Sequence, residues 1–316
     1  MFLDFEKQVA EFEGKIEELR HISGDGGSNI AAEITKLQVK AERQLKTIYD
    51  KLSPWQKVQV ARHPNRPHFK EVIKSLFSEF INLAGDRSYG EDKAISAGLA
   101  RFRDRSVMII GTEKGNTTQE RLETNFGMAM PEGYRKVKRL MEMADRFNLP
   151  ILTFIDTAGA YPGVEAEERG QAEAIARSIE TSLSVNVPIV AVILGEGGSG
   201  GAVALATADK VLMLEHSIYS VISPEGCASI LWRSSENATN AANSLRLTAQ
   251  DLYSLNIIDS IIKEPLGAAH RDHQTTLTSL GDAIESSLED LLSTQTKSFR
   301  ENRRKKFIAM TDNKLI

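Results

Sequence analysis

The segment with the clearest chemical potential is residues 195–201, Gly-Glu-Gly-Gly-Ser-Gly-Gly. It follows the apolar run 188–194 and precedes the small apolar run 202–206, so we expect a loop between a strand and a helix. Consecutive glycines at a helix N-terminus let backbone N–H groups approach a developing oxyanion, and the positive end of the helix dipole adds to the attraction. One interpretation is therefore a site that stabilises negative charge without using side chains.

Residues 195–200 also match the G-x-G-x-x-G fingerprint of dinucleotide-binding domains, and Glu215 follows where a ribose-binding acid would stand. Two features disfavour this interpretation. The helix expected after the loop is short, ending near Asp209, and two or three strands precede a fingerprint that usually opens its domain.

Residues 197–201 match a third pattern, the G-x-S-x-G nucleophile elbow, with Asp259 and either His270 or His273 following in hydrolase order. Both histidines lie in a polar stretch that is typical of a surface loop. A fourth interpretation is purely structural, because glycines permit a tight turn and close packing of a helix on a strand. The segment alone leaves all four interpretations open.

A second glycine-containing loop is expected at 156–163, Asp-Thr-Ala-Gly-Ala-Tyr-Pro-Gly, directly after the apolar run 151–155. The runs 151–155 and 188–194 are almost continuously apolar, which is typical of parallel strands covered on both faces. Parallel strands release their loops at one edge of the sheet, where α/β folds place their chemistry. We therefore expect the two loops to be neighbours, with backbone donors that suit a thioester or urea oxygen becoming negative.

The other elements predict an α/β domain preceded by a helical hairpin. Apolar residues recur every three or four positions at 5–19 and at 30–52, with a turn-rich break at 23–29. Further strands are expected at 95–102, 107–111, 211–214 and 218–222, and helices near 72–85, 131–147 and 166–184 and from 224 and 249. We divide the chain into a hairpin at 1–53, a main domain at 54–296 and a basic tail at 297–316, whose cations we expect on a solvated helix end.

Composition and charge exclude several classes of protein. The 316 residues carry 39 basic and 43 acidic side chains, a net charge of −4, so the whole chain has no general attraction to nucleic acid or anionic lipid. Cys227 is the single cysteine, which excludes an internal disulfide, and we expect no metal site in this chain. No run is apolar enough to span a bilayer, and the acidic first residues do not resemble a secretory signal. We expect a cytoplasmic protein.

The most specific string in the chain is 220–232, Ser-Val-Ile-Ser-Pro-Glu-Gly-Cys-Ala-Ser-Ile-Leu-Trp. With it, the chain resembles the alpha-subunit family of the acetyl-CoA carboxylase carboxyltransferase of bacteria and plastids. The other segments that carry the resemblance are 2–6, 125–128, 131–136, 155–163, 168–171, 195–202, 258–262 and 264–267, so it spans nearly the whole chain. One departure is Ala158, where the family usually has proline, and this loosens a turn beside the expected site.

The resemblance implies a crotonase-like fold of repeated ββα units and an assembly of two alpha and two beta chains. It implies transfer of a carboxyl group from carboxybiotin, held on biotin carboxyl carrier protein, to acetyl-CoA, giving malonyl-CoA for fatty acid synthesis. Biotin carboxylase is implied as a further partner, and a four-cysteine zinc site is implied in the beta chain. This chain would be active only together with that beta chain.

The family pattern also implies which residues form the site. It assigns the backbone N–H groups of Gly200 and Gly201 to an oxyanion hole for the ureido oxygen of biotin. The loops on the biotin side would contain Gly197, Gly198, Gly159, Ala160 and Tyr161. A matching pair of glycines for the acetyl-CoA enolate would come from the beta chain. Two alternatives remain, another crotonase-type acyl-CoA enzyme that acts without biotin, and a non-catalytic scaffold that uses the hairpin for assembly.

Overall fold

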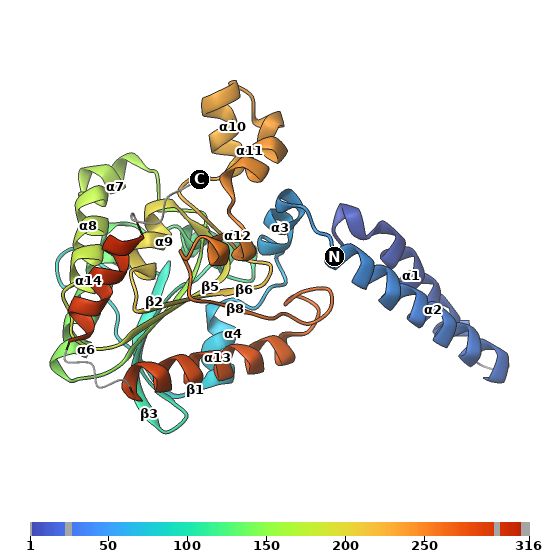
Figure 1. The fold of residues 1–316 in the computed structure, drawn as a ribbon, viewed down its shortest axis with the longest axis horizontal. Helices are drawn as coiled ribbons and strands as arrows, with labels where there is room; N and C mark the ends of the chain where they lie inside the picture. Colours follow the sequence, from blue (N-terminus) through green and yellow to red (C-terminus); the bar gives the residue numbers. More distant parts are fainter. Residues whose placement is uncertain (1, 23–26, 294–297, 311–316) are drawn as a thin grey trace.

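The centre of the molecule is one mixed sheet of eight strands (Figure 1), seen in a computed structural model that describes residues 2–22, 27–293 and 298–310. The strand order is β1-β2-β3-β4-β5-β6-β8, and β7 pairs with the end of β5. Pairing is antiparallel from β1 to β3 and parallel from β3 onward. The strands are β1 (Phe77–Asn82), β2 (Ile95–Phe102), β3 (Arg105–Thr112), β4 (Ile151–Thr157), β5 (Ile189–Gly198), β6 (Lys210–Leu214), β7 (Ile218–Ser220) and β8 (Ser260–Ile262).

Helices precede, separate and follow these strands. In the first half of the chain they are η1 (Asp4–Glu6), α1 (Lys7–Ile22), α2 (Gly27–Tyr49), α3 (Pro54–Ala61), α4 (Phe69–Leu76), α5 (Thr118–Glu123), η2 (Asn125–Gly127) and α6 (Pro131–Arg146). In the second half they are α7 (Val164–Glu168), α8 (Gln171–Ser182), α9 (Ser199–Ala206), α10 (Pro224–Trp232), η3 (Ser235–Asn237), α11 (Ala238–Leu245), α12 (Ala249–Ser254), α13 (His273–Ser293) and α14 (Phe299–Ala309). None of the helices in the described part of the chain is both long and apolar enough to cross a bilayer.

Both faces of the sheet are covered, as the continuous apolar strands predicted. Successive side chains of a strand point to opposite faces. Ile151 and Ile155 of β4 join a core cluster with helices α6, α8 and α9, whereas Leu152 and Phe154 join a second cluster with α4 and α13. The alternation extends to Asp156, which therefore lies on the α4 face, away from α9.

The helix predicted near 72–85 is wrong in its second half. Helix α4 ends at Leu76, and the chain continues as the edge strand β1, which pairs with β2. The register shifts between Ser78 and Ile81, where Glu79 has a φ of 54°, so β1 contains a bulge that interrupts the two-residue alternation. Because that alternation is interrupted, the apolar residues at 72–83 recur every three or four positions, which favoured a helix. Gly85 lies in the turn after the strand and caps no helix.

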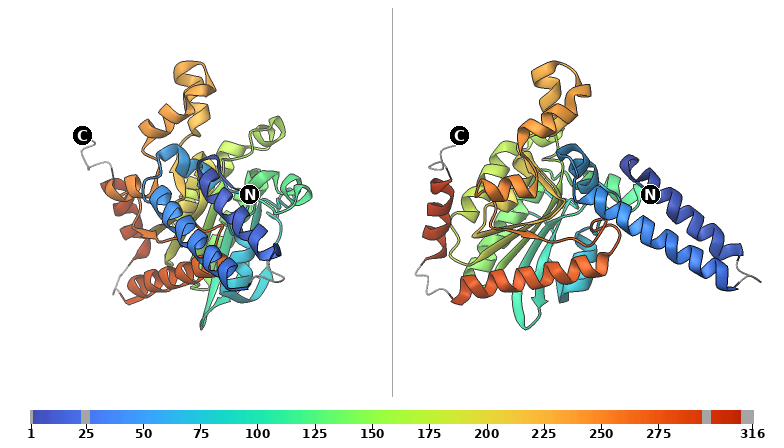
Figure 2. Two further views of the ribbon diagram at one scale, coloured as in Figure 1. Left: turned by 90° about the vertical axis from the view of Figure 1, so that its right-hand side faces the viewer. Right: turned by 45° about the vertical axis from the view of Figure 1, so that its right-hand side comes forward.

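The predicted hairpin is present as α1 and α2, which project from the main body (Figures 1 and 2). The predicted break at 23–29 includes 23–26, which lie outside the described residues. At its base Val9, Leu45 and Tyr49 pack against Val60 and Ala268, which fixes the hairpin to the main body.

The end of the chain is bound more tightly than the expected solvated helix end, and that prediction is wrong for Arg303. This side chain on α14 is buried, with its Nη2 2.6 Å from Oδ2 of Asp209. Its guanidinium also donates to the backbone carbonyl oxygens of Ser182, Val185 and Val187. The sequence predicted a solvent-exposed helix end because the partners of Arg303 lie 94 or more residues earlier, where no local pattern indicates them.

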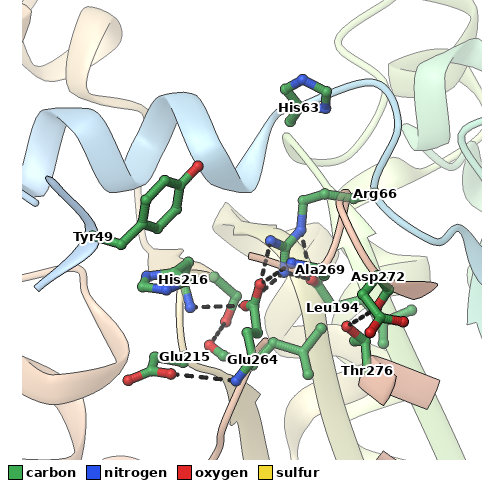
Figure 3. A network of polar contacts seen from close by, with 12 residues as sticks. Tyr49, His63, Arg66, Leu194, Glu215, His216, Glu264, Ala269, Asp272 and Thr276 are labelled. Carbon is green, nitrogen blue, oxygen red and sulfur yellow. Dashed lines mark hydrogen bonds and ion pairs between the residues drawn. The ribbon is translucent and has the colours of Figure 1, made fainter. Parts of the chain in front are cut away.

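A buried ion pair supports the carboxyl end of β5 (Figure 3). Arg66 donates from both terminal nitrogens to the Glu264 carboxylate at 2.9 Å, and one of them also donates to the carbonyl oxygen of Leu194 at 2.7 Å. The same carboxylate accepts the N–H groups of His216 at 2.9 Å and Ala269 at 2.6 Å. Arg66 and Glu264 thus join the segments around residues 66, 216 and 264–269 to β5 at Leu194, the residue that precedes the glycine segment.

Candidate active site

The glycine segment 195–201 is a direct strand-to-helix junction and not the loop that was expected. Strand β5 continues through Gly198, and α9 begins at Ser199, whose φ is 51°. The first N–H groups of a helix have no partner inside the helix, and no side chain caps α9. Gly200 and Gly201 therefore lie in the first turn of α9 with their amides at its positive end.

The turn after β4 packs directly on this first turn, as predicted for neighbouring parallel strands. A Cβ atom at Gly201 would lie 2.7 Å from the carbonyl carbon of Gly159 and 2.9 Å from the nitrogen of Ala160. A Cβ atom at Gly198 would overlap the carbonyl oxygen of Ala158. Glycine at 198 and 201 thus brings the two backbones together, because any side chain there would separate them.

The remaining residues of the expected site lie close by, with different surroundings. Gly197 is inside β5, where a Cβ atom would lie 3.1 Å from the ring of Tyr219. Tyr161 donates its N–H to the carbonyl oxygen of Ala129 at 3.0 Å, and its ring packs against Gly163. The structure therefore gathers Gly159, Ala160, Gly198, Gly200 and Gly201 at one junction, with Gly197 and Tyr161 at its margins.

Two sets of ion pairs, here called ionic braces, join separate segments around the junction, and the sequence did not predict them. Arg62 donates to Glu196 at 2.6 and 3.0 Å and to Glu225 on α10 at 2.6 Å, so it joins the glycine strand to that helix. Lys114 pairs with Asp156 at 2.7 Å, and the same Asp156 oxygen accepts the N–H of Glu196 at 2.9 Å. The sequence signal for the second brace was the position of Asp156 at the carboxyl end of an apolar strand.

The charge on Asp156 is held in place by its neighbours. Burial alone would raise its pKa, but the Lys114 ammonium holds the pKa well below its usual range. Asp156 is therefore ionised and keeps its contacts with Lys114 and Glu196. Gly195 makes room for it, because a Cβ atom there would lie 2.6 Å from Oδ1 of Asp156.

The hydrolase interpretation does not fit this geometry. None of the hydrogen bonds or ion pairs found across the described ranges joins Ser199 to a histidine. His270 stacks on His63 with ring centroids 3.9 Å apart, and Nε2 of His273 lies 2.6 Å from the carbonyl oxygen of Asn65. Asp259 accepts from the N–H of Val211 and from Lys306. The expected triad members are therefore separate structural groups.

The dinucleotide interpretation fails for a related reason. Gly195 and Gly197 lie within β5 rather than in a phosphate-binding loop, and α9 has only 8 residues. Glu215 pairs with Lys263 at 2.6 Å. What remains is the first turn of α9, whose amides have no partner inside the helix, packed against the turn after β4. This arrangement favours the stabilisation of a developing oxyanion.

Comparison with known proteins agrees with this geometry. Residues 2–311 match the family model described as acetyl co-enzyme A carboxylase carboxyltransferase-like. The acetyl-coenzyme A carboxylase carboxyl transferase subunit alpha of Paramagnetospirillum magneticum is 64% identical over 98% of this chain and 97% of its own length. The chain belongs to this carboxyltransferase family. The subunit alpha of Rhizobium johnstonii is 58% identical over 99% of both chains. The family resemblance found in the sequence is confirmed.

Solved structures support the crotonase-like fold. Transcarboxylase 12S matches 73% of this chain and 43% of its own, with a TM-score of 0.60 and 18% identity. A Pseudomonas malonate decarboxylase hetero-tetramer in complex with coenzyme A matches 72% of this chain and 91% of its own, with a TM-score of 0.57 and 13% identity. At these identities the likeness concerns the fold alone, and the predicted fold class is confirmed.

Proposed function

We propose that this chain is the alpha half of a divided carboxyltransferase that transfers the carboxyl group of carboxybiotin to acetyl-CoA and so forms malonyl-CoA. The observation that supports this proposal most directly is the close packing of Gly159 and Ala160 on the helix turn of Gly200 and Gly201, in a chain of the carboxyltransferase family. It works in the cytoplasm, with biotin carboxyl carrier protein delivering the carboxylated group and biotin carboxylase reloading it.

The chain contributes position and electrostatics. The backbone N–H groups of Gly200 and Gly201 hold the negative charge that develops on the ureido oxygen, and Gly159, Ala160 and Gly198 fix the distance between the two turns. Carboxybiotin supplies the carboxyl group and, once that group has left, a basic nitrogen. Preorganised amides need no reorientation during the reaction. Because the basic nitrogen can take the α proton of acetyl-CoA, no general base is required of this chain.

A beta subunit completes the site in an assembly of two alpha and two beta chains, and its zinc site stays within the beta chain. The surface offered to it includes α10, which stands away from the sheet together with α11 (Figure 1). The side chains of Val221, Ile230, Leu231 and Trp232 are 76, 72, 65 and 44% exposed. Large apolar side chains that cluster in the open are typical of a subunit interface. Arg62 links this surface to the glycine strand.

The direct test is malonyl-CoA formation from acetyl-CoA and carboxybiotin, using this chain, a cognate zinc-containing beta subunit, and both together. We expect activity only in the mixture. Activity of this chain alone on an enoyl-CoA would instead favour an independent crotonase-type enzyme. Partner binding without any transfer, with the beta subunit shown to be competent, would favour the scaffold.

Replacement of Leu231 by aspartate is expected to weaken binding of the beta subunit by about 10-fold or more, because a charge would then be buried at the interface. Sedimentation or surface plasmon resonance with the purified beta subunit measures this affinity. Tyr253→Asp is the control, since Tyr253 on α12 is also exposed, at 52%. Equal affinity of the Leu231→Asp variant and the unsubstituted chain would exclude α10 from the interface.

A further inference from the structure

A cavity of about 240 Å³ lies beside the glycine junction, on the opposite face of the sheet from α9. Its walls come from the α3–α4 connection, the segment after β3, and the end of β4. The lining side chains that matter here are Arg62, His68, Lys114, Arg121, Phe126 and Asp156. The cavity is smaller than the roughly 300–1,000 Å³ of sites for drug-sized molecules. It has room for a small ligand or for several waters.

His68 is the first sign that the cavity is built for an occupant. Its side chain is buried, with 4% of the residue exposed. Nδ1 faces Oδ2 of Asp156 at 3.5 Å, a weak contact, and within the described ranges neither ring nitrogen makes a hydrogen bond. Buried polar groups are normally hydrogen-bonded, because leaving one without a partner costs free energy. A polar ligand in the cavity would supply the missing partner.

The charges on the walls favour an anion. Lys114 is balanced by Asp156, and Arg62 pairs with two carboxylates, Glu196 and Glu225, neither of which lines the cavity. Arg121 donates to the carbonyl oxygen of Gly115 at 3.2 Å, and no described carboxylate lies within ion-pair distance of it. The lining therefore has an unbalanced guanidinium, the side chain best suited to carboxylate or phosphate oxygens.

The aromatic wall depends on an unusual backbone. Asn125, Phe126 and Gly127 have φ values of 47, 55 and 81°, so three consecutive residues are left-handed. A Cβ atom at Gly127 would lie 2.9 Å from the carbonyl oxygen of Asp156, which explains the glycine. Conformations of this kind persist only where the surroundings determine them, and they are frequent at binding sites.

We propose that this cavity binds a small oxyanion, a carboxylate or a phosphate group, at a site separate from the glycine junction. Arg121 and Lys114 face the anion, His68 donates a ring N–H to it, and Phe126 covers its apolar side. Ala158 lines the cavity and its carbonyl oxygen touches Gly198, so an occupant rests against the turn that packs on α9. The site does not depend on the proposed function, because binding is measured without carboxyl transfer.

The test is calorimetric titration of the full chain with malonate and with inorganic phosphate at constant ionic strength, with chloride as the reference anion. We expect saturable 1:1 binding of at least one of the two. Arg121→Met should weaken it by about 10-fold to 100-fold, as expected for loss of a charge-assisted contact. Arg146→Met removes the same charge from an exposed position on α6 and should leave the affinity unchanged.

A second variant, His68→Gln, tests the specific contact of the His68 ring with the anion. It removes no lysine or arginine charge, and it keeps an N–H donor but changes the position of that donor. Its affinity should fall while Arg146→Met keeps that of the original chain. Binding of malonate alone would identify the occupant as a carboxylate, and binding of phosphate alone as a phosphate group. Absence of saturable binding, or equal weakening by Arg121→Met and Arg146→Met, would overturn the proposal and leave a cavity filled by water.

Discussion

Replacement of Gly201 by alanine is expected to lower the rate of carboxyl transfer by about 100-fold to 1,000-fold, the usual effect of losing one oxyanion donor. The new Cβ atom would lie 2.7 Å from the carbonyl carbon of Gly159, and both neighbours are backbone that cannot rotate away. The two turns must separate by a few tenths of an ångström or more. The amide of Gly201 would then no longer point at the place where charge develops.

The rate is measured in the alpha–beta mixture with saturating partner, and circular dichroism and urea unfolding show whether the chain stays folded. Gly200→Ala should cost less than Gly201→Ala, because the nearest atoms to its Cβ belong to Ile175 at 3.6 Å. Gly14→Ala is the neutral control, since nothing lies within 4 Å of the added atom. Transfer by Gly201→Ala at close to the normal rate would refute the assignment of the junction.

Replacement of Arg66 by methionine is expected to lower the free energy of unfolding by about 3–5 kcal/mol, the usual result of removing one partner of a buried pair. Glu264 would remain fully buried with its charge unbalanced, and the carbonyl oxygen of Leu194 would lose its donor. Urea unfolding measures the change. Lys263→Met is the control, because the Lys263 side chain is 79% exposed and its pair with Glu215 should contribute no more than about 1 kcal/mol.

The pH dependence of this loss gives an independent check. Burial alone would raise the pKa of Glu264, but the Arg66 guanidinium lowers it from 4.5 to about 2. The stabilisation is therefore complete above about pH 4.5 and disappears as the pH falls towards 2. In Arg66→Met the buried carboxyl takes up a proton more easily, so the difference between the two proteins should shrink as the solution is acidified. A difference that grows on acidification would contradict this account.

Local patterns predicted much of the fold. The range 95–102 was expected as a strand from its composition and is β2, and helices α10 and α12 begin at residues 224 and 249 as expected, with Ser223 and Thr248 as their N-caps. The edge strand β1 was missed, because its bulge at Glu79 removes the alternation on which the prediction depends. The junction of β5 and α9 was expected as a loop because glycine is rare in strands, yet Gly195 and Gly197 lie in β5, where Asp156 and Tyr219 leave no room for a side chain.

The sequence was enough to predict which two backbone segments meet at the candidate site. Parallel strands with glycine-containing ends were enough to place residues 156–163 beside residues 195–201. The ionic braces were not predictable, because Arg62 and Glu196 are 134 residues apart and no periodicity relates them. The cavity with His68 and Arg121 could not be predicted for the same reason. The three segments that line it are remote in sequence and meet only in the folded chain.

The position of Arg303 has a consequence for how the chain is made. Asp209 and the carbonyl oxygens after α8 receive their guanidinium from a residue 94 positions beyond Asp209. During synthesis the sheet can form while that residue is still inside the ribosome, and until it emerges the Asp209 carboxylate has the N–H of Ile189 but not its cationic partner. The last helix is therefore the final part of the chain to pack, and the ion pair of Asp209 with Arg303 can form only after residue 303 has left the ribosome.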